Sequence, residues 1–117
     1  MFDFEKLQVF DKARFFNKEL RKQILKTSAV DNVTRYQLSR AALSIMLNIA
    51  EGSGRFTNPD KRKFYIIARG SLFESTAILD FLLDEEVIDR LKYDRFYRLA
   101  EELSKMLFVM IRKLERK

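Results

Sequence analysis

The chemistry open to this chain is limited by the side chains that it lacks. Its 117 residues include no His and no Cys, which are common general bases, nucleophiles and metal ligands in proteins. The densest carboxylate group is Asp84, Glu85, Glu86 and Asp89. Carboxylates can hold Mg²⁺, but this group falls where a helix is expected to end, and we interpret it as a solvated connection. The sequence therefore predicts no enzyme activity, metal site or cofactor, since an enzyme would need carboxylate-only chemistry.

Cationic side chains are the ones best suited to binding a ligand. Lys and Arg number 23 against 17 Asp and Glu, a net charge of +6, and residues 74–89 contain six acids and no Lys or Arg. Helical projection predicts two basic ridges, one of Arg14, Lys18, Arg21 and Lys22 and one of Arg98, Lys105, Arg112 and Arg116. Such ridges attract phosphate backbones through counterion release. An ordinary solvated helix face is the alternative interpretation.

A polar stripe in the middle of the chain leads into a glycine-containing turn. Glu51 is expected at the negative end of a helix dipole, where a carboxylate needs a cationic partner. Arg40, Arg55 and Arg69 are available to supply one. We interpret the group as a structural network that fixes the turn, and a ligand site is the alternative. The spacing Gly52-x-Gly54 lacks the lysine and strand context of a phosphate-binding loop.

Four helices are expected to position these side chains, because three Gly and one Pro are too few turn residues for a sheet protein of this length. They are predicted at about residues 4–27, 35–51, 59–84 and 90–113. Thr34 and Asn58 are expected to cap the second and third, and the permissive backbone of Gly52 and Gly54 to end the second. Short connections favour an all-α, antiparallel up-and-down four-helix bundle, forming a single domain over residues 1–117.

The two middle helices have more apolar surface than a bundle core needs. In the third helix, the set predicted to face the core is Phe64, Ile67, Ala68, Ser71, Ser75, Ile78 and Leu82. The opposite faces of the two helices have Tyr36, Leu43 and Leu47, and Ile66, Gly70, Phe73 and Ala77. These helices are either the more buried pair of the bundle or part of a subunit interface. We favour the interface, because apolar patches rimmed by polar residues mark association surfaces and glycine permits close approach.

The hydropathy pattern gives no reason to expect a membrane protein. Charged residues interrupt every apolar stretch before it reaches the length of a membrane-spanning helix or a signal-peptide core. The absence of cysteine is compatible with a reducing compartment. We therefore expect a soluble, cytoplasmic protein with no membrane partner.

Several segments form a recognisable pattern. They read SRAALSI at residues 39–45, NIAEGSGR at 48–55, and Phe64 followed by ARGSL at 68–72 and Glu74. With FEKL at residues 4–7, they resemble the 23S ribosomal RNA intervening-sequence protein family, also called S23. The resemblance covers about residues 4–85, and NIAEG is its most specific part. Met46 and Leu47 depart from it, because the family often has proline and a small residue before the asparagine.

That resemblance implies a bacterial four-helix bundle without catalytic residues, whose relatives include pentameric rings. It extends to the accessory variability protein of diversity-generating retroelements, a basic pentamer associated with nucleic acid and reverse transcriptase. It implies roles in folding, assembly or binding for Asn48, Glu51, Gly52, Arg55, Arg69, Gly70 and Glu74. We therefore expect a homo-oligomer, pentameric by resemblance, that binds RNA or DNA through its basic ridges. The alternative is a scaffold for an acidic partner protein.

Overall fold

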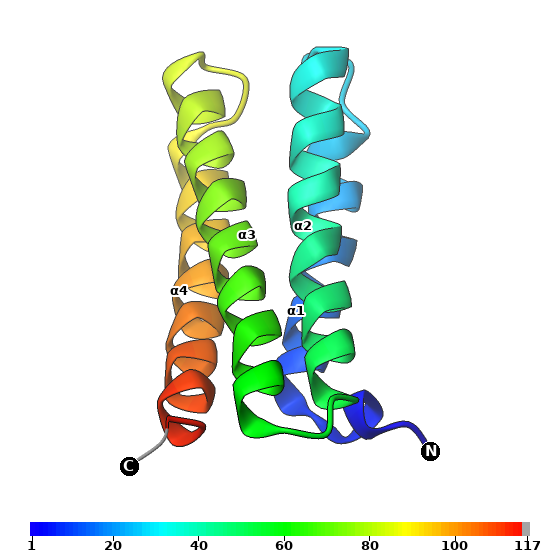
Figure 1. Ribbon diagram of the computed structural model, residues 1–117. Coiled ribbons are helices and arrows are strands. Elements are labelled where there is room, and N and C mark those ends of the chain that lie inside the picture. The colour runs from blue at the N-terminus through cyan, green and yellow to red at the C-terminus, as the bar shows by residue number, and fades with distance from the viewer. Residues whose placement is uncertain (116–117) are drawn as a thin grey trace.

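The computed structural model describes residues 1–115, whose long helices form an antiparallel bundle (Figure 1). A 3-10 turn, η1 (Asp3–Lys6), precedes α1 (Gln8–Leu20), which continues into a π-helical turn, η2 (Arg21–Leu25). The other helices are α2 (Asn32–Ser53), α3 (Asn58–Asp84) and α4 (Arg90–Lys113). Each helix packs on the next, and α1 also contacts α4, which closes the bundle. The predicted all-α, up-and-down four-helix bundle is confirmed.

Two helix starts differ from the prediction because other side chains cap them. Asp31, not Thr34, caps α2, and its carboxylate accepts hydrogen bonds from the Thr34 backbone N at 2.8 Å and hydroxyl at 2.9 Å. The backbone bond is the main cause that lowers the pKa of Asp31, followed by the hydroxyl bond. Thr57, not Asn58, caps α3 by accepting from Asp60 N at 3.3 Å. The predicted caps at Thr34 and Asn58 are therefore wrong.

The first predicted helix, residues 4–27, is interrupted near its start. Leu7 has extended backbone angles, φ −94° and ψ 123°, and separates η1 from α1. At the other end, the Arg35 guanidinium donates hydrogen bonds to the carbonyl oxygens of Leu25, Thr27 and Val30. These bonds satisfy acceptors that a helix end leaves without partners, so Arg35 closes the connection between α1 and α2.

The core of the bundle lies where all four helices meet. The rings of Phe16 and Phe96 pack edge to face with centroids 6.0 Å apart, and the buried Asn17 amide donates to the carbonyl oxygen of Ala42 at 2.8 Å. On α3 the buried residues are Tyr65, Ala68, Ser71, Leu72, Ser75, Leu79 and Leu82. Ile67 was predicted to face the core but is 41% exposed. The core-facing arc of α3 is rotated from the predicted one, because α3 packs against α4 as well as α2.

Small residues allow α2 and α3 to lie close together. The hydroxyl oxygens of Ser44 and Ser71 are 2.7 Å apart. A Cβ atom on Gly52 would lie 2.8 Å from Cε1 of Tyr65, so this position needs glycine for space. The helix α2 ends at the predicted turn, with Gly54 as its C-cap. No glycine has a positive φ, so this ending does not use the backbone freedom that was predicted for it.

The left-handed conformation occurs instead between α3 and α4, at Glu86, with φ 60°. There the Val87 N–H donates to the Leu82 carbonyl oxygen at 2.9 Å, as in a Schellman ending. The carboxylates of the 84–89 segment lie at this turn, and Asp89 caps α4 by accepting from Lys92 N at 2.8 Å. None of the helices within residues 1–115 has the length and apolar character needed to cross a membrane.

Candidate nucleic-acid interface

The basic ridge of α1 contains charges in two different situations. Arg14 lies 3.1 Å from Asp11, and Lys22 lies 3.9 Å from Glu19, so these two cations have acidic neighbours. Lys18 and Arg21 are exposed and form no ion pair within residues 1–115. Half of the predicted ridge is therefore without a counter-charge.

The basic ridge of α4 has a similar division. Arg112 lies 3.3 Å from Glu115, whereas Arg98 and Lys105 are exposed and lack an ion-pair partner in the described part of the chain. Arg116, the fourth predicted member, lies outside the described residues. The uncompensated cations of this ridge are thus in the middle of α4.

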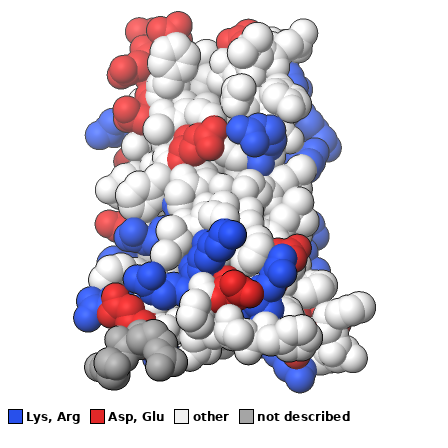
Figure 2. Space-filling view, viewed as in Figure 1, with Lys and Arg blue, Asp and Glu red and all other residues white. Residues whose placement is uncertain are grey.

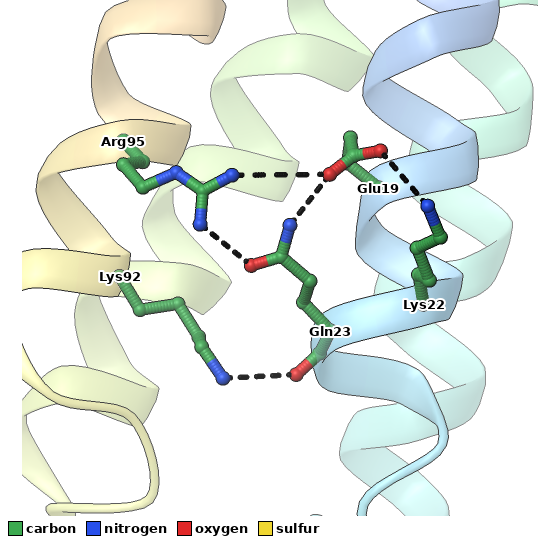
Figure 3. A network of polar contacts seen from close by, with 5 residues as sticks. All are labelled: Glu19, Lys22, Gln23, Lys92 and Arg95. Carbon is green, nitrogen blue, oxygen red and sulfur yellow. Dashed lines mark hydrogen bonds and ion pairs between the residues drawn. The ribbon is translucent and has the colours of Figure 1, made fainter.

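A polar network at the seam between α1 and α4 uses cations of both helices (Figure 3). Arg95 donates to the side-chain oxygen of Gln23 at 3.0 Å and lies 3.9 Å from Glu19. Lys92 donates to the backbone oxygen of Gln23 at 3.3 Å, and Lys22 approaches Glu19 from the other side. The Glu19 side chain is only 15% exposed. The seam is therefore a structural contact in which Lys22 and Arg95 share the largely buried carboxylate of Glu19.

The two ridges do not merge into one surface. On α1, the residues that contact α4 are Lys12, Glu19 and Gln23. Arg14, Lys18 and Arg21 lie roughly 100–180° around the helix from them, at 100° per residue, and so face the α2 side of the bundle. Lys22 lies nearer the seam, beside Glu19. On α4, Arg112 lines a groove with α3. The ridges consequently occupy opposite flanks of the molecule.

That groove between α3 and α4 is a cationic site that the sequence analysis did not identify. It has a volume of about 390 Å³ and contains Arg62 and Arg69 of α3 and Arg112 of α4. Phe73 and Phe108 line it as well, and the Arg69 guanidinium carbon lies 4.8 Å and 5.5 Å from the centroids of these two rings. Hereafter we call it the arginine groove.

A sequence signal for the arginine groove was present. Arg62, Arg69 and Phe73 are spaced by seven and four residues on α3, and Phe108 and Arg112 by four on α4. Such spacings place side chains on one face of a helix. Recognising the groove also required the register of α3 against α4, which periodicity within one helix does not give.

The charges on the face formed by α2 and α3 are unevenly distributed. Figure 2 shows acidic side chains gathered at the end that contains the α3–α4 connection, and basic side chains mainly over the opposite half. Between them, much of the face is uncharged. Of the predicted interface residues, Tyr36, Leu47, Ile66, Gly70, Phe73 and Ala77 are exposed and Leu43 is half-buried. Most of these side chains are therefore not part of the core of a single chain.

The predicted interface residues lie in two separate settings. Tyr36, Leu43 and Leu47 share one side of α2, and we call them the α2 stripe. Leu47 also lines a groove at the end of the bundle with the exposed rings of Phe2 and Phe56. On α3, the residues Ile66, Gly70 and Phe73 instead line the arginine groove, and Phe73 and Ala77 line its continuation along α4.

The six residues predicted as a polar network are also divided. Arg55 donates to the Glu51 carboxylate at 2.6 Å and so supplies its cationic partner. Arg40 lies 4.0 Å from Glu74, which connects α2 with α3. Arg69 points to α4, where its Nε donates to the Ser104 carbonyl oxygen at 3.3 Å.

The remaining member, Asn48, makes local contacts. Its amide donates to the backbone oxygen of Ser44 at 2.9 Å and to the Ser44 hydroxyl at 3.0 Å. That hydroxyl is the one that meets Ser71 of α3. Asn48 therefore supports the α2–α3 contact. Within residues 1–115, no cluster of three or more acidic side chains is arranged to hold a metal ion.

Comparison with known proteins agrees with the fold and with the sequence pattern. The family model described as 23S rRNA-intervening sequence protein matches residues 5–109. A solved structure of a protein with unknown function, from the S23 ribosomal protein family of Bacteroides thetaiotaomicron VPI-5482, is 26% identical in sequence. It aligns with a TM-score of 0.83 over 88% of this chain and 97% of the other. No curated protein matches the chain.

Proposed function

The chain belongs to the 23S rRNA-intervening sequence protein family, and from this membership we propose that it is a non-enzymatic homo-oligomer that binds RNA through its basic helix surfaces. The observation that carries the proposal is the set of uncompensated cations on both flanks, Lys18, Arg21, Arg98 and Lys105. A phosphate backbone in contact with them would release condensed counterions. Contacts of this kind give affinity with little sequence preference.

Assembly is the second part of the proposal. In the α2 stripe, Tyr36 is 63% exposed and Leu47 is 59% exposed. Arg40, the cation beside them, already has Glu74 as a partner. A second copy could therefore cover the stripe without burying an unpaired charge. A ring would also repeat the basic flanks around an axis and strengthen their field, and a pentamer is the stoichiometry that the family resemblance favours.

The composition supports a binding role over an enzymatic one. With no His and no Cys in its sequence, the chain lacks the side chains most used for proton transfer and covalent catalysis near neutral pH. We place the protein in the cytoplasm, where RNA is available and a cysteine-free chain needs no oxidising compartment.

A fluorescence polarisation titration tests the RNA-binding part. Labelled single- and double-stranded RNA and DNA of equal length are titrated with the protein at two salt concentrations. We expect binding near micromolar protein that weakens steeply as salt rises. If nucleic acid does not bind but an acidic polypeptide does, the protein is a scaffold for an acidic partner, and the proposal is wrong.

A further inference from the structure

We infer that the arginine groove binds single-stranded nucleic acid, with phosphates held by its arginines and unpaired bases stacked on Phe73 and Phe108. This inference rests on the proposed RNA-binding function and adds to it a site and a preference for unpaired strands. It also removes Ile66, Gly70 and Phe73 from the predicted subunit interface.

The charges of the groove favour a polyanion. Its three arginines face one carboxylate, Glu115, which lies 3.4 Å from Arg62 and 3.3 Å from Arg112. The net charge among these four side chains is therefore positive. Both ion pairs are partly exposed, and such pairs are weak enough to be exchanged for phosphate contacts. The Nε atom of Arg62 is buried and has no hydrogen-bond partner within the described residues.

The aromatic rings of the groove favour unpaired bases. Phe73 is 55% exposed and Phe108 is 46% exposed. The hydrogen bond to Ser104 holds Arg69 beside both rings. Bases of single strands stack on aromatic rings and on arginine planes, whereas the bases of a duplex are already stacked on one another. A duplex could therefore use only the charges of this groove.

The shape of the groove also suits a strand. Apart from its neighbours in the chain and the adjacent backbone of α3, no heavy atom of residues 1–115 lies within 4 Å of the position that a Cβ atom on Gly70 would take. A nucleic-acid backbone can therefore approach the α3 main chain closely at this point. The segment from Arg62 to Phe73 extends about 17 Å along α3 at the rise of an α-helix, so the groove accommodates more than one nucleotide.

Acidic residues limit how far a strand can follow α3 and α4. Beyond Phe73, the space between the two helices is lined by Asp80 and Glu101 together with Tyr93 and Tyr97. No Lys or Arg among residues 1–115 lines that part, and its carboxylates repel phosphates. We therefore expect the bound strand to leave the groove near Phe73 rather than to cover the whole length of the bundle.

Two variants and one control variant test the inference by fluorescence polarisation with labelled oligouridine and a blunt-ended RNA duplex of equal length. Arg69→Gln removes one positive charge from the groove. The control, Arg90→Gln, removes one positive charge at the acidic end of the bundle. Phe108→Leu keeps the site apolar but removes a ring. We expect Arg69→Gln and Phe108→Leu each to weaken oligouridine binding roughly tenfold. Phe108→Leu should leave duplex binding unchanged, and Arg90→Gln should behave as wild type.

Each other result has a defined meaning, provided that thermal unfolding shows the variants to be folded. Equal losses for Arg69→Gln and Arg90→Gln would show that only net charge matters and would overturn the inference. Unchanged binding after Arg69→Gln and Phe108→Leu, with salt-sensitive RNA binding retained, would overturn it but leave the proposed function intact. A changed oligomer mass in Arg69→Gln, or equal competition by polyglutamate, would assign the groove to another copy or to an acidic protein. No binding of either RNA would overturn both proposals.

Discussion

The α2 stripe and the arginine groove both expose large apolar side chains, but their charges differ. In the α2 stripe, Tyr36 and Leu47 have Arg40 beside them, and Arg40 is paired with Glu74. In the arginine groove, Arg62 and Arg112 share the carboxylate of Glu115, and the third guanidinium group, that of Arg69, has no carboxylate partner within the described residues. Apolar exposure alone would assign both regions to subunit contacts.

The free energy of burying charge separates the two regions. Covering the α2 stripe with another copy would remove apolar surface from water and leave few charges without partners. Covering the arginine groove in the same way would bury at least two guanidinium groups without an anionic partner, which is costly in free energy. A nucleic-acid strand supplies such partners, and an identical apolar surface does not.

The largest effect is expected in the α2 stripe. Leu47→Lys should convert the oligomer to a monomer, because an unpaired charge buried at an interface costs about 3–5 kcal/mol, a hundredfold or more in the dissociation constant. Leu91→Lys is the matched control, since Leu91 is 72% exposed on α4 and lines neither region. Light scattering at several protein concentrations measures the mass. A monomeric wild type, or equal dissociation by both variants, would contradict the assignment.

A smaller effect is expected from the α1 ridge, which should act on paired and unpaired RNA alike. Lys18→Gln combined with Arg21→Gln removes two uncompensated cations and should lower the salt slope of RNA binding by roughly two. Arg14→Gln combined with Lys22→Gln removes the same charge, but Asp11 and Glu19 already compensate these cations. The salt slope of RNA binding should therefore change less in this second double variant. Fluorescence polarisation over a salt series measures both slopes. Equal slopes for the two pairs would contradict this role of uncompensated charge.

The smallest effect is expected from a substitution of Gly70 in the arginine groove, and it concerns the free energy of unfolding. Gly70→Ala should raise the free energy of unfolding by about 0.5–1 kcal/mol, because alanine favours a helix over glycine and the new methyl group meets no neighbour. The same change should weaken oligouridine binding. Gly52→Ala is the contrasting variant, because its Cβ would lie 2.8 Å from Tyr65 and should destabilise the protein. Chemical denaturation at one protein concentration measures the free energy of unfolding of both variants. A destabilised Gly70→Ala variant would show that the groove is not open.

Much of the fold could be predicted because it depends on local pattern. The bounds predicted for α4, residues 90–113, agree with the structure, since Asp89 caps its start and its apolar stripe is regular. The starts of helices were less predictable where several polar side chains could act as the cap, as Asp31 and Thr34 could before α2. The role of Gly52 could not be inferred from its neighbours in sequence, because Tyr65, which restricts it, lies on another helix.

The candidate site was predicted less completely, for a related reason. Helical projection identified the cations of the two ridges but did not show which of them pair with carboxylates three residues away, as Arg14, Lys22 and Arg112 do. It also placed Phe73 on an outward face without showing that Phe108 lies across a groove from it. Residues brought together by the packing of two helices become visible only once the register of those helices is known.

The most direct test is a methyl NMR titration of isotope-labelled protein with single-stranded RNA of about ten nucleotides, a length within the range of single-strand binding sites. Ile66 and Ile111 report on the arginine groove, and Leu43 and Leu47 report on the α2 stripe. We predict that RNA shifts the methyl signals of Ile66 and Ile111 and leaves those of Leu43 and Leu47 in place. Shifts at Leu43 and Leu47, with none at Ile66 and Ile111, would contradict the division of roles between the two regions.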